Sequence, residues 1–242
     1  MGLPPPYEES RLQDISHNLG MVRERIAAAA VRAGRDPKSV RLLAVSKGQP
    51  LASVESAWGQ GQADFGENYL QDALPKLAAF AGRPAVWHFI GALQSNKSRE
   101  VATRFQWLHT LDRESIARRL SEQRPEGATP LQVCLQVNVS GESSKGGVMP
   151  ERVVALVEAV IGLPNLKLRG LMAIPAPVED VEAQRKPFRV LRELLEDLQR
   201  RGHELDTLSM GMSDDLEAAI LEGATIVRVG TAVFGPRAAK RP

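Results

Sequence analysis

A single lysine, Lys47, follows a short run of mostly apolar residues, 42–46, of the kind that forms a buried strand. A lysine at the tip of a buried strand loses part of its hydration, which favours the neutral amine and makes it a nucleophile toward aldehydes. This position predicts Schiff-base chemistry. The alternative from the run alone is a solvated lysine that only opens the polar loop 47–50.

Two segments near the end of the sequence could bind a phosphate group. Ser213 lies at the expected start of a helix, and Gly230 and Thr231 follow the last predicted strand. Backbone N–H groups at a helix start and hydroxyl groups are good donors to phosphate, so together these segments predict a phosphate cup. For Ser213, the competing interpretation is an ordinary helix N-cap.

An arginine, Arg228, lies between two valines in the last predicted strand. Because side chains alternate along a strand, Arg228 points away from the side taken by its neighbours, and in a barrel that direction is the interior of the mouth. A buried arginine needs an acceptor or a stacked ring. We therefore expect Arg228 to contribute a cation to the same site.

These residues must be positioned by strands and helices that alternate along the chain. Apolar runs predict eight strands, at residues 41–46, 62–65, 86–89, 106–109, 132–138, 167–171, 207–209 and 225–229. Helical patterns lie between them, and an amphipathic helix at residues 12–32 precedes the first strand. This order favours an α/β fold with a single (β/α)8 TIM barrel and an extra N-terminal helix, and an open doubly wound sheet is the alternative. In a barrel the candidate residues share one rim, at the C-terminal ends of the strands.

Composition limits the remaining possibilities. The chain has 242 residues, and we expect a flexible tail at residues 1–10 and one barrel domain at residues 11–238. The formal net charge of +2 is close to zero and does not indicate a surface that binds nucleic acid. Cys134 is the single cysteine, which fits a reducing cytoplasm and predicts no cysteine metal cluster. No apolar stretch approaches the roughly twenty residues of a membrane span.

Several motifs, in this order, closely resemble those of the pyridoxal-phosphate homeostasis proteins. The resemblance extends from about residue 12 to residue 237 and rests on these segments: LLAVSK, FGENY, WHFIG, LQSNK, LDR, QVNVSGESSKGG, GLMAI, LSMGMSDDLEAAI and VRVGTAVFGPR. It implies a fold type III barrel for pyridoxal 5'-phosphate (PLP). Such a barrel is similar to the N-terminal domain of alanine racemase, without that enzyme's C-terminal β domain.

The resemblance also implies a role for each candidate residue. Lys47 forms the internal aldimine with PLP, and Arg228 faces the pyridine nitrogen. The phosphate is held by Ser213, Gly230 and Thr231.

Three further residues have two interpretations each. Asn68 and His88 match family positions that line the pocket, but Asn68 could instead cap a helix and His88 could be a hydrogen-bonded core histidine. Lys145, in a glycine-flanked loop after the fifth strand, is either a solvated loop lysine or a secondary PLP lysine that assists loading and release.

Three classes of function remain. The resemblance favours a PLP-binding protein that buffers the cofactor or delivers it to apo-PLP enzymes and has no catalytic activity. We expect this protein to be a monomer rather than a dimer. The alternative is a fold type III amino-acid racemase, which needs a second acid/base residue; neither Tyr7 nor Tyr69 is a good substitute. A third class is a Schiff-base aldolase that uses Lys47 without PLP.

Overall fold

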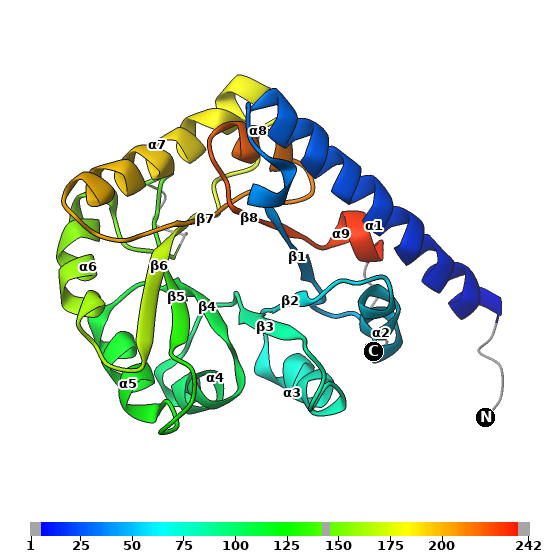
Figure 1. The fold of residues 1–242 in the computed structure, drawn as a ribbon, viewed down its shortest axis with the longest axis horizontal. Helices are drawn as coiled ribbons and strands as arrows, with labels where there is room; N and C mark the ends of the chain where they lie inside the picture. The colour runs from blue at the N-terminus through cyan, green and yellow to red at the C-terminus, as the bar shows by residue number, and fades with distance from the viewer. Residues whose placement is uncertain (1–5, 142–145, 237–242) are drawn as a thin grey trace.

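Eight parallel strands form a closed barrel in the computed structural model, which describes residues 6–141 and 146–236, with side chains described from residue 14 (Figure 1). In chain order the strands are β1 (Arg41–Val45), β2 (Asp64–Glu67), β3 (Val86–Phe89), β4 (Trp107–Leu111), β5 (Leu131–Gln136), β6 (Leu166–Met172), β7 (Thr207–Ser209) and β8 (Ile226–Val229). Each strand pairs with the next, and β8 pairs with β1, which closes the sheet. The TIM-barrel prediction is confirmed, and the open-sheet alternative is wrong.

Helices follow the strands and surround the barrel. They are α2 (Leu51–Gly59), α3 (Leu70–Ala79), α4 (Ser98–Arg104), α5 (Glu114–Gln123), α6 (Val153–Ile161), α7 (Val181–Arg200), α8 (Leu216–Leu221) and α9 (Thr231–Phe234). Helix α7 shows why such segments fold locally: the Asp180 side chain accepts the N–H of Ala183, and one face is apolar and buried. Short 3₁₀ turns at Pro37–Ser39, Ser95–Lys97 and Pro150–Arg152 complete the described elements.

The N-terminal helix α1 (Pro6–Arg32) begins earlier than predicted and lies across α2, α8 and α9 (Figure 1). Residues 6–10 are therefore helical, whereas we expected them to belong to a tail; residues 1–5 lie outside the described part of the chain. Proline suits the first helical turn, and the acidic residues that follow it favour a helix N-terminus. The predicted apolar face is confirmed, with these residues buried: Ile15, Leu19, Val22 and Ile26.

The core has two parts. The larger part lies between the strands and the helices, and a smaller cluster fills the inside of the barrel. At the N-terminal end of the strands, the Trp107 ring contacts Arg41 and Arg169, whose guanidinium carbons are 5.8 and 5.3 Å from its ring centroid. These three side chains lie at one end of the barrel, and the candidate functional residues lie at the other end.

Candidate functional site

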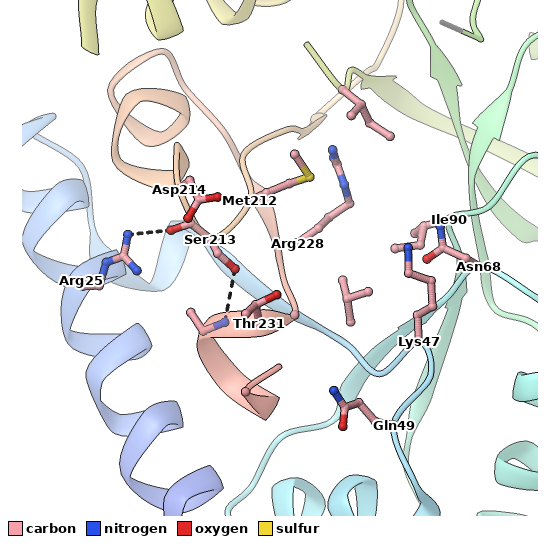
Figure 2. Close-up of a pocket in the computed structure, with 15 residues that line it drawn as sticks. Arg25, Lys47, Gln49, Asn68, Ile90, Met212, Ser213, Asp214, Arg228 and Thr231 are labelled. Carbon is pink, nitrogen blue, oxygen red and sulfur yellow. Dashed lines mark hydrogen bonds between the residues drawn. The ribbon is translucent and has the colours of Figure 1, made fainter. Parts of the chain in front are cut away.

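A pocket of about 590 Å³ opens at the C-terminal ends of the strands. It is lined by six of the predicted site residues, namely Lys47, Asn68, Ser213, Arg228, Gly230 and Thr231 (Figure 2). They come from the segments that follow β1 and β2, from the loop between β7 and α8, from β8, and from the start of α9. The prediction that these residues share one rim is therefore confirmed as a matter of position.

The half-buried Lys47 stands two residues beyond the end of β1, and its side chain extends into the pocket toward Asn68 (Figure 2). The chain turns sharply at the next residue, because Gly48 has a φ of 69°. Strand and turn together direct the amine into the pocket. Lys47 therefore lines the pocket in addition to beginning the polar loop.

A buried ion pair holds the backbone directly before Lys47. The Nζ of Lys76 lies 2.6 Å from Oε1 of Glu67 and donates to the carbonyl oxygen of Ser46 at 2.7 Å. The hydroxyl of Ser46 donates to the same Glu67 oxygen at 2.6 Å. Burial raises the pKa of Glu67, and the charge of Lys76 opposes that rise. Strand β1, strand β2 and helix α3 are thus locked together beside the amine.

Sequence reasoning missed Lys76. A signal was present, because Lys76 lies three residues after Ala73 and six after Leu70, on the buried face of α3. A lysine at a buried helical position requires a partner, and Asp72 and Glu67 are the two carboxylates that most closely precede it in the sequence.

Ser213 joins the loop after β7 to the first turn of α9. Its hydroxyl oxygen accepts the N–H of Ala232 at 3.4 Å, and its carbonyl oxygen accepts a hydrogen bond from Arg25 Nη2 at 2.9 Å (Figure 2). The N-cap interpretation of Ser213 is wrong, since α8 begins at Leu216 and its N-cap residue is Asp215. The hydroxyls of Ser213 and Thr231 and the N–H groups at the start of α9 therefore lie together at one side of the pocket.

Arg25, from α1, is a second residue that sequence reasoning missed. Its guanidinium makes two hydrogen bonds with the Glu217 carboxylate, at 2.8 and 2.9 Å, and one with the Ser213 carbonyl. These contacts raise the pKa of Arg25, chiefly through the hydrogen bond to Glu217. No sequence signal could have found this residue, because its position depends on how α1 packs against α8.

Arg228 is almost fully buried at the inner side of the pocket. Its Nη1 donates to Ser209 Oγ at 2.8 Å and its Nη2 donates to the Ala173 carbonyl at 2.9 Å. Burial lowers the pKa of Arg228 to about 10, and the nearby Asp215 carboxylate opposes this shift. The expectation that a buried arginine must find acceptors is met by one hydroxyl and one carbonyl.

His88 lies outside the lining of this pocket. It is fully buried inside the barrel, with Nε2 2.9 Å from Asp64 Oδ1 and Nδ1 2.9 Å from His109 Nε2. Its ring stacks on Trp107. His88 is therefore a hydrogen-bonded histidine of the barrel core, as the second of its two interpretations predicted. Ile90, two residues further on, lines the pocket instead.

Asn68 lines the pocket and is not a helix cap, since α3 begins at Leu70 after the N-cap residue Tyr69. Its Oδ1 is buried, with no hydrogen-bond partner among the described residues. The backbone of Asn68 lies so close to Gly91 that a Cβ there would stand 2.0 Å from the Asn68 carbonyl oxygen. Lys145, the possible second lysine, lies outside the described residues.

The arrangement has a defined chemical character. A primary amine, a buried cation and a group of hydroxyl and N–H donors face one cavity, which suits a small aldehyde that also carries a phosphate group. In the described part of the chain no cluster of three metal-ligating side chains occurs. None of the described helices combines the length and apolar character that crossing a membrane requires.

Known proteins are similar in sequence to this chain over nearly its whole length. The family model "Alanine racemase, N-terminal domain" matches residues 11–238. A pyridoxal phosphate homeostasis protein from Pseudomonas aeruginosa is 61% identical over 93% of this chain and 97% of its own length. One from Escherichia coli K12 is 49% identical over 93% of this chain and 98% of its own. This chain belongs to the pyridoxal phosphate homeostasis protein family.

Solved structures agree with this membership. The structure of PipY from Synechococcus elongatus with PLP bound is 36% identical, has a TM-score of 0.76, and covers 88% of this chain and 100% of its own. Alanine racemase from E. faecalis shares the fold, with a TM-score of 0.70 at 19% identity, over 93% of this chain but 58% of the enzyme. This homeostasis-family protein therefore has the barrel part of that larger architecture, as the sequence motifs implied.

Proposed function

We propose that this protein binds PLP covalently through Lys47 and serves in intracellular PLP homeostasis, as a buffer or carrier of the cofactor. The observation that carries the proposal is the placement of an amine, a cation and a set of phosphate donors around one pocket. The volume, about 590 Å³, falls in the usual range for sites that bind small molecules. Relatives named for PLP homeostasis and the PLP-bound PipY structure support the same function.

The residues present fit the cofactor. PLP supplies an aldehyde that condenses with a primary amine, and Lys47 is the lysine among the described residues that line the pocket. The hydroxyls of Ser213 and Thr231 and the N–H groups at the start of α9 bind the phosphate. Arg228 would lie on the side of the pyridine nitrogen, and its positive charge would disfavour protonation of that nitrogen. The unpartnered Asn68 Oδ1 offers an acceptor to a donor on the ligand.

The same pocket argues for binding rather than catalysis. An unprotonated pyridine nitrogen weakens the cofactor as an electron sink, and a racemase also needs a second acid/base group. The described lining residues include no tyrosine, histidine or cysteine, and their one carboxylate, Asp214, is exposed. Tyr69 is 58% exposed and does not line this pocket. We propose that the protein is not a racemase, which assays of racemisation on a panel of L-amino acids test directly.

Borohydride reduction of the PLP-loaded protein, followed by peptide mapping, tests the covalent site. We expect the phosphopyridoxyl group on Lys47, and we expect Lys47→Ala to lose it while its thermal unfolding stays cooperative, because a rim residue contributes little core area. Lys97→Ala is the matched control, since Lys97 is an exposed lysine at the same end of the barrel. A label found only on another lysine would overturn the assignment.

Delivery is the finer part of the proposal. A carrier must release the aldehyde intact, and exchange between two amines is faster than hydrolysis of the bond to one. We propose that Lys145 assists this exchange, that apo-PLP enzymes are the recipients, and that the protein acts as a cytoplasmic monomer. Lys145→Ala should slow transfer to an apo-enzyme with little change in the absorption spectrum of the bound cofactor. Unchanged transfer rates over a range of acceptor concentrations would contradict a role for Lys145.

A further inference from the structure

A continuous chain of hydrogen bonds crosses the interior of the barrel from the pocket to the opposite end. Arg228 Nη1 lies 2.8 Å from Ser209 Oγ, and Ser209 Oγ lies 2.7 Å from His109 Nδ1. His109 Nε2 lies 2.9 Å from His88 Nδ1, and His88 Nε2 lies 2.9 Å from Asp64 Oδ1. Ser209 and both histidines are fully buried. The chain links the inner side of the pocket to a carboxylate at the N-terminal end of β2.

When both rings are neutral, the Asp64 end of the chain fixes the direction of every bond in it. An ionised Asp64 carboxylate can only accept, so His88 carries its proton on Nε2 and donates to Asp64. Nδ1 of His88 is then an acceptor, so His109 carries its proton on Nε2 and donates to it. The remaining nitrogen, His109 Nδ1, accepts the Ser209 hydroxyl proton, and Ser209 Oγ accepts from Arg228, which can only donate. One tautomer of each histidine satisfies all four contacts.

Charge is confined to the ends of this chain. Burial lowers the pKa of His88, against the opposing effect of Asp64, and burial together with nearby cations lowers the pKa of His109 further. Both rings are therefore neutral at physiological pH, which is the condition for the bond directions given above. Arg228 has no carboxylate in direct hydrogen-bond contact among the described residues, so its nearest hydrogen-bonded connection to a negative charge passes through this chain.

We propose that Ser209, His109, His88 and Asp64 are positioning residues that together hold the Arg228 guanidinium in one orientation at the inner side of the pocket. In this arrangement the Asp64 carboxylate polarises the chain, because aligned hydrogen bonds strengthen one another in a low-dielectric interior. The Ala173 carbonyl fixes a second nitrogen of the same guanidinium. The consequence for the ligand rests on the proposed function: a fixed cation faces the pyridine nitrogen, whereas an unsupported one would have several rotamers.

The first test needs no cofactor. In ¹⁵N-labelled protein without PLP, NMR of the imidazole nitrogens reports which nitrogen of each histidine carries the proton. We expect His88 and His109 both to be neutral at neutral pH, with the proton on Nε2. A proton on Nδ1 of either ring, or a cationic ring, would contradict the proposed hydrogen-bond chain, whether or not the protein binds PLP.

The second test breaks the chain at its pocket end. Ser209→Ala leaves Arg228 Nη1 without its acceptor, and we expect PLP affinity to fall about tenfold, with a shifted absorption maximum of the bound cofactor. The matched control is Thr207→Val, which removes another buried hydroxyl from β7, one that donates to Asp206 outside the chain. The control should keep the wild-type affinity and spectrum. Equal losses in the two variants would show a general packing effect and would refute the proposal.

The third test separates the hydrogen bond from the charge at the far end. Asp64→Asn keeps an acceptor oxygen for His88 and removes the charge, while Asp64→Ala removes both. We expect the alanine variant to disturb the histidine signals and PLP affinity more than the asparagine variant does. Asp64 also contacts Arg41 at 3.4 Å, so Arg41→Met is the control that loses that ion pair and the contact of Arg41 with the Trp107 ring but keeps the Asp64 carboxylate. Wild-type behaviour of Asp64→Ala in both measurements would exclude any role for this carboxylate.

Discussion

The buried pair of Glu67 and Lys76 gives a stability prediction that can be worked out from its contacts. The two side chains are 0% and 6% exposed, and Lys76 Nζ also donates to the Ser46 carbonyl. Lys76→Met preserves most of the side-chain volume but, among the described residues, leaves the Glu67 carboxylate with a single donor, the Ser46 hydroxyl. Removing one partner of a buried ion pair costs about 3–5 kcal/mol of unfolding free energy. For a domain with a total stability of about 5–15 kcal/mol this loss is large.

A double variant separates the charge from the packing. Glu67→Gln with Lys76→Met retains an acceptor for the Ser46 hydroxyl and buries no charge. We expect its unfolding free energy to lie within about 1 kcal/mol of the wild-type value, because replacing a whole buried pair is often neutral. Lys97→Met, at an exposed position, is the control and should change stability by less than about 0.5 kcal/mol.

The loss in Lys76→Met should depend on pH. Burial raises the pKa of Glu67 above 4.5, and removing Lys76 raises it further. A carboxyl with a raised pKa in the folded state stabilises that state when protonated, and this stabilisation is lost as pH rises through the folded pKa. The deficit relative to wild type should therefore be greatest at neutral pH and shrink as pH falls toward 4.5. Urea unfolding at both pH values measures it, and an equal deficit at the two would refute this reasoning.

Three further outcomes are expected. Ser213→Ala with Thr231→Ala should weaken PLP binding about tenfold and pyridoxal binding much less, in equilibrium titrations, because the lost donors act on the phosphate; equal losses would indicate collapse of the rim. Gly91→Ala should lower the midpoint of thermal unfolding and weaken PLP binding, since its Cβ would meet the Asn68 carbonyl at 2.0 Å; an unchanged midpoint would contradict that clash. Burial raises the pKa of the Cys134 thiol to about 12, so iodoacetamide should alkylate it only in urea, and rapid labelling of the native protein would refute this.

The strand pattern could be predicted closely where strands are bounded by clear turn residues. Strands β3 and β7 have the predicted limits, whereas β2 was predicted at residues 62–65 and lies at Asp64–Glu67. The error has a physical cause, because Glu67 looks like a loop residue until Lys76 is known to neutralise it in the interior. In place of strand pairing, Gln62 donates from its side chain to the backbone carbonyls of Leu42 and Asp64.

The sequence could predict at which end of the barrel a site residue lies, but not how deep in the barrel interior its side chain lies. The rule that strand C-termini meet at one rim placed Lys47, Ser213 and Arg228 together, since it needs only the order of the strands. His88, in β3, and Ile90, which directly follows that strand, are two residues apart and both point inward, yet only Ile90 lines the pocket. Depth depends on the stagger between strands, and parity within one strand carries no information about stagger.

The hydrogen-bond chain from Arg228 to Asp64 shows why the stagger between strands matters for the site. His88, His109, Ser209 and Arg228 come from β3, β4, β7 and β8, and the contact between His109 and Ser209 joins two strands that are not neighbours in the sheet. The interior of an eight-stranded barrel is filled by side chains, and buried polar groups must bond to one another there. Polar residues at inward positions therefore predict that some network exists. Which partners form it, and hence which pocket residue it supports, follows only from the closed barrel and its stagger.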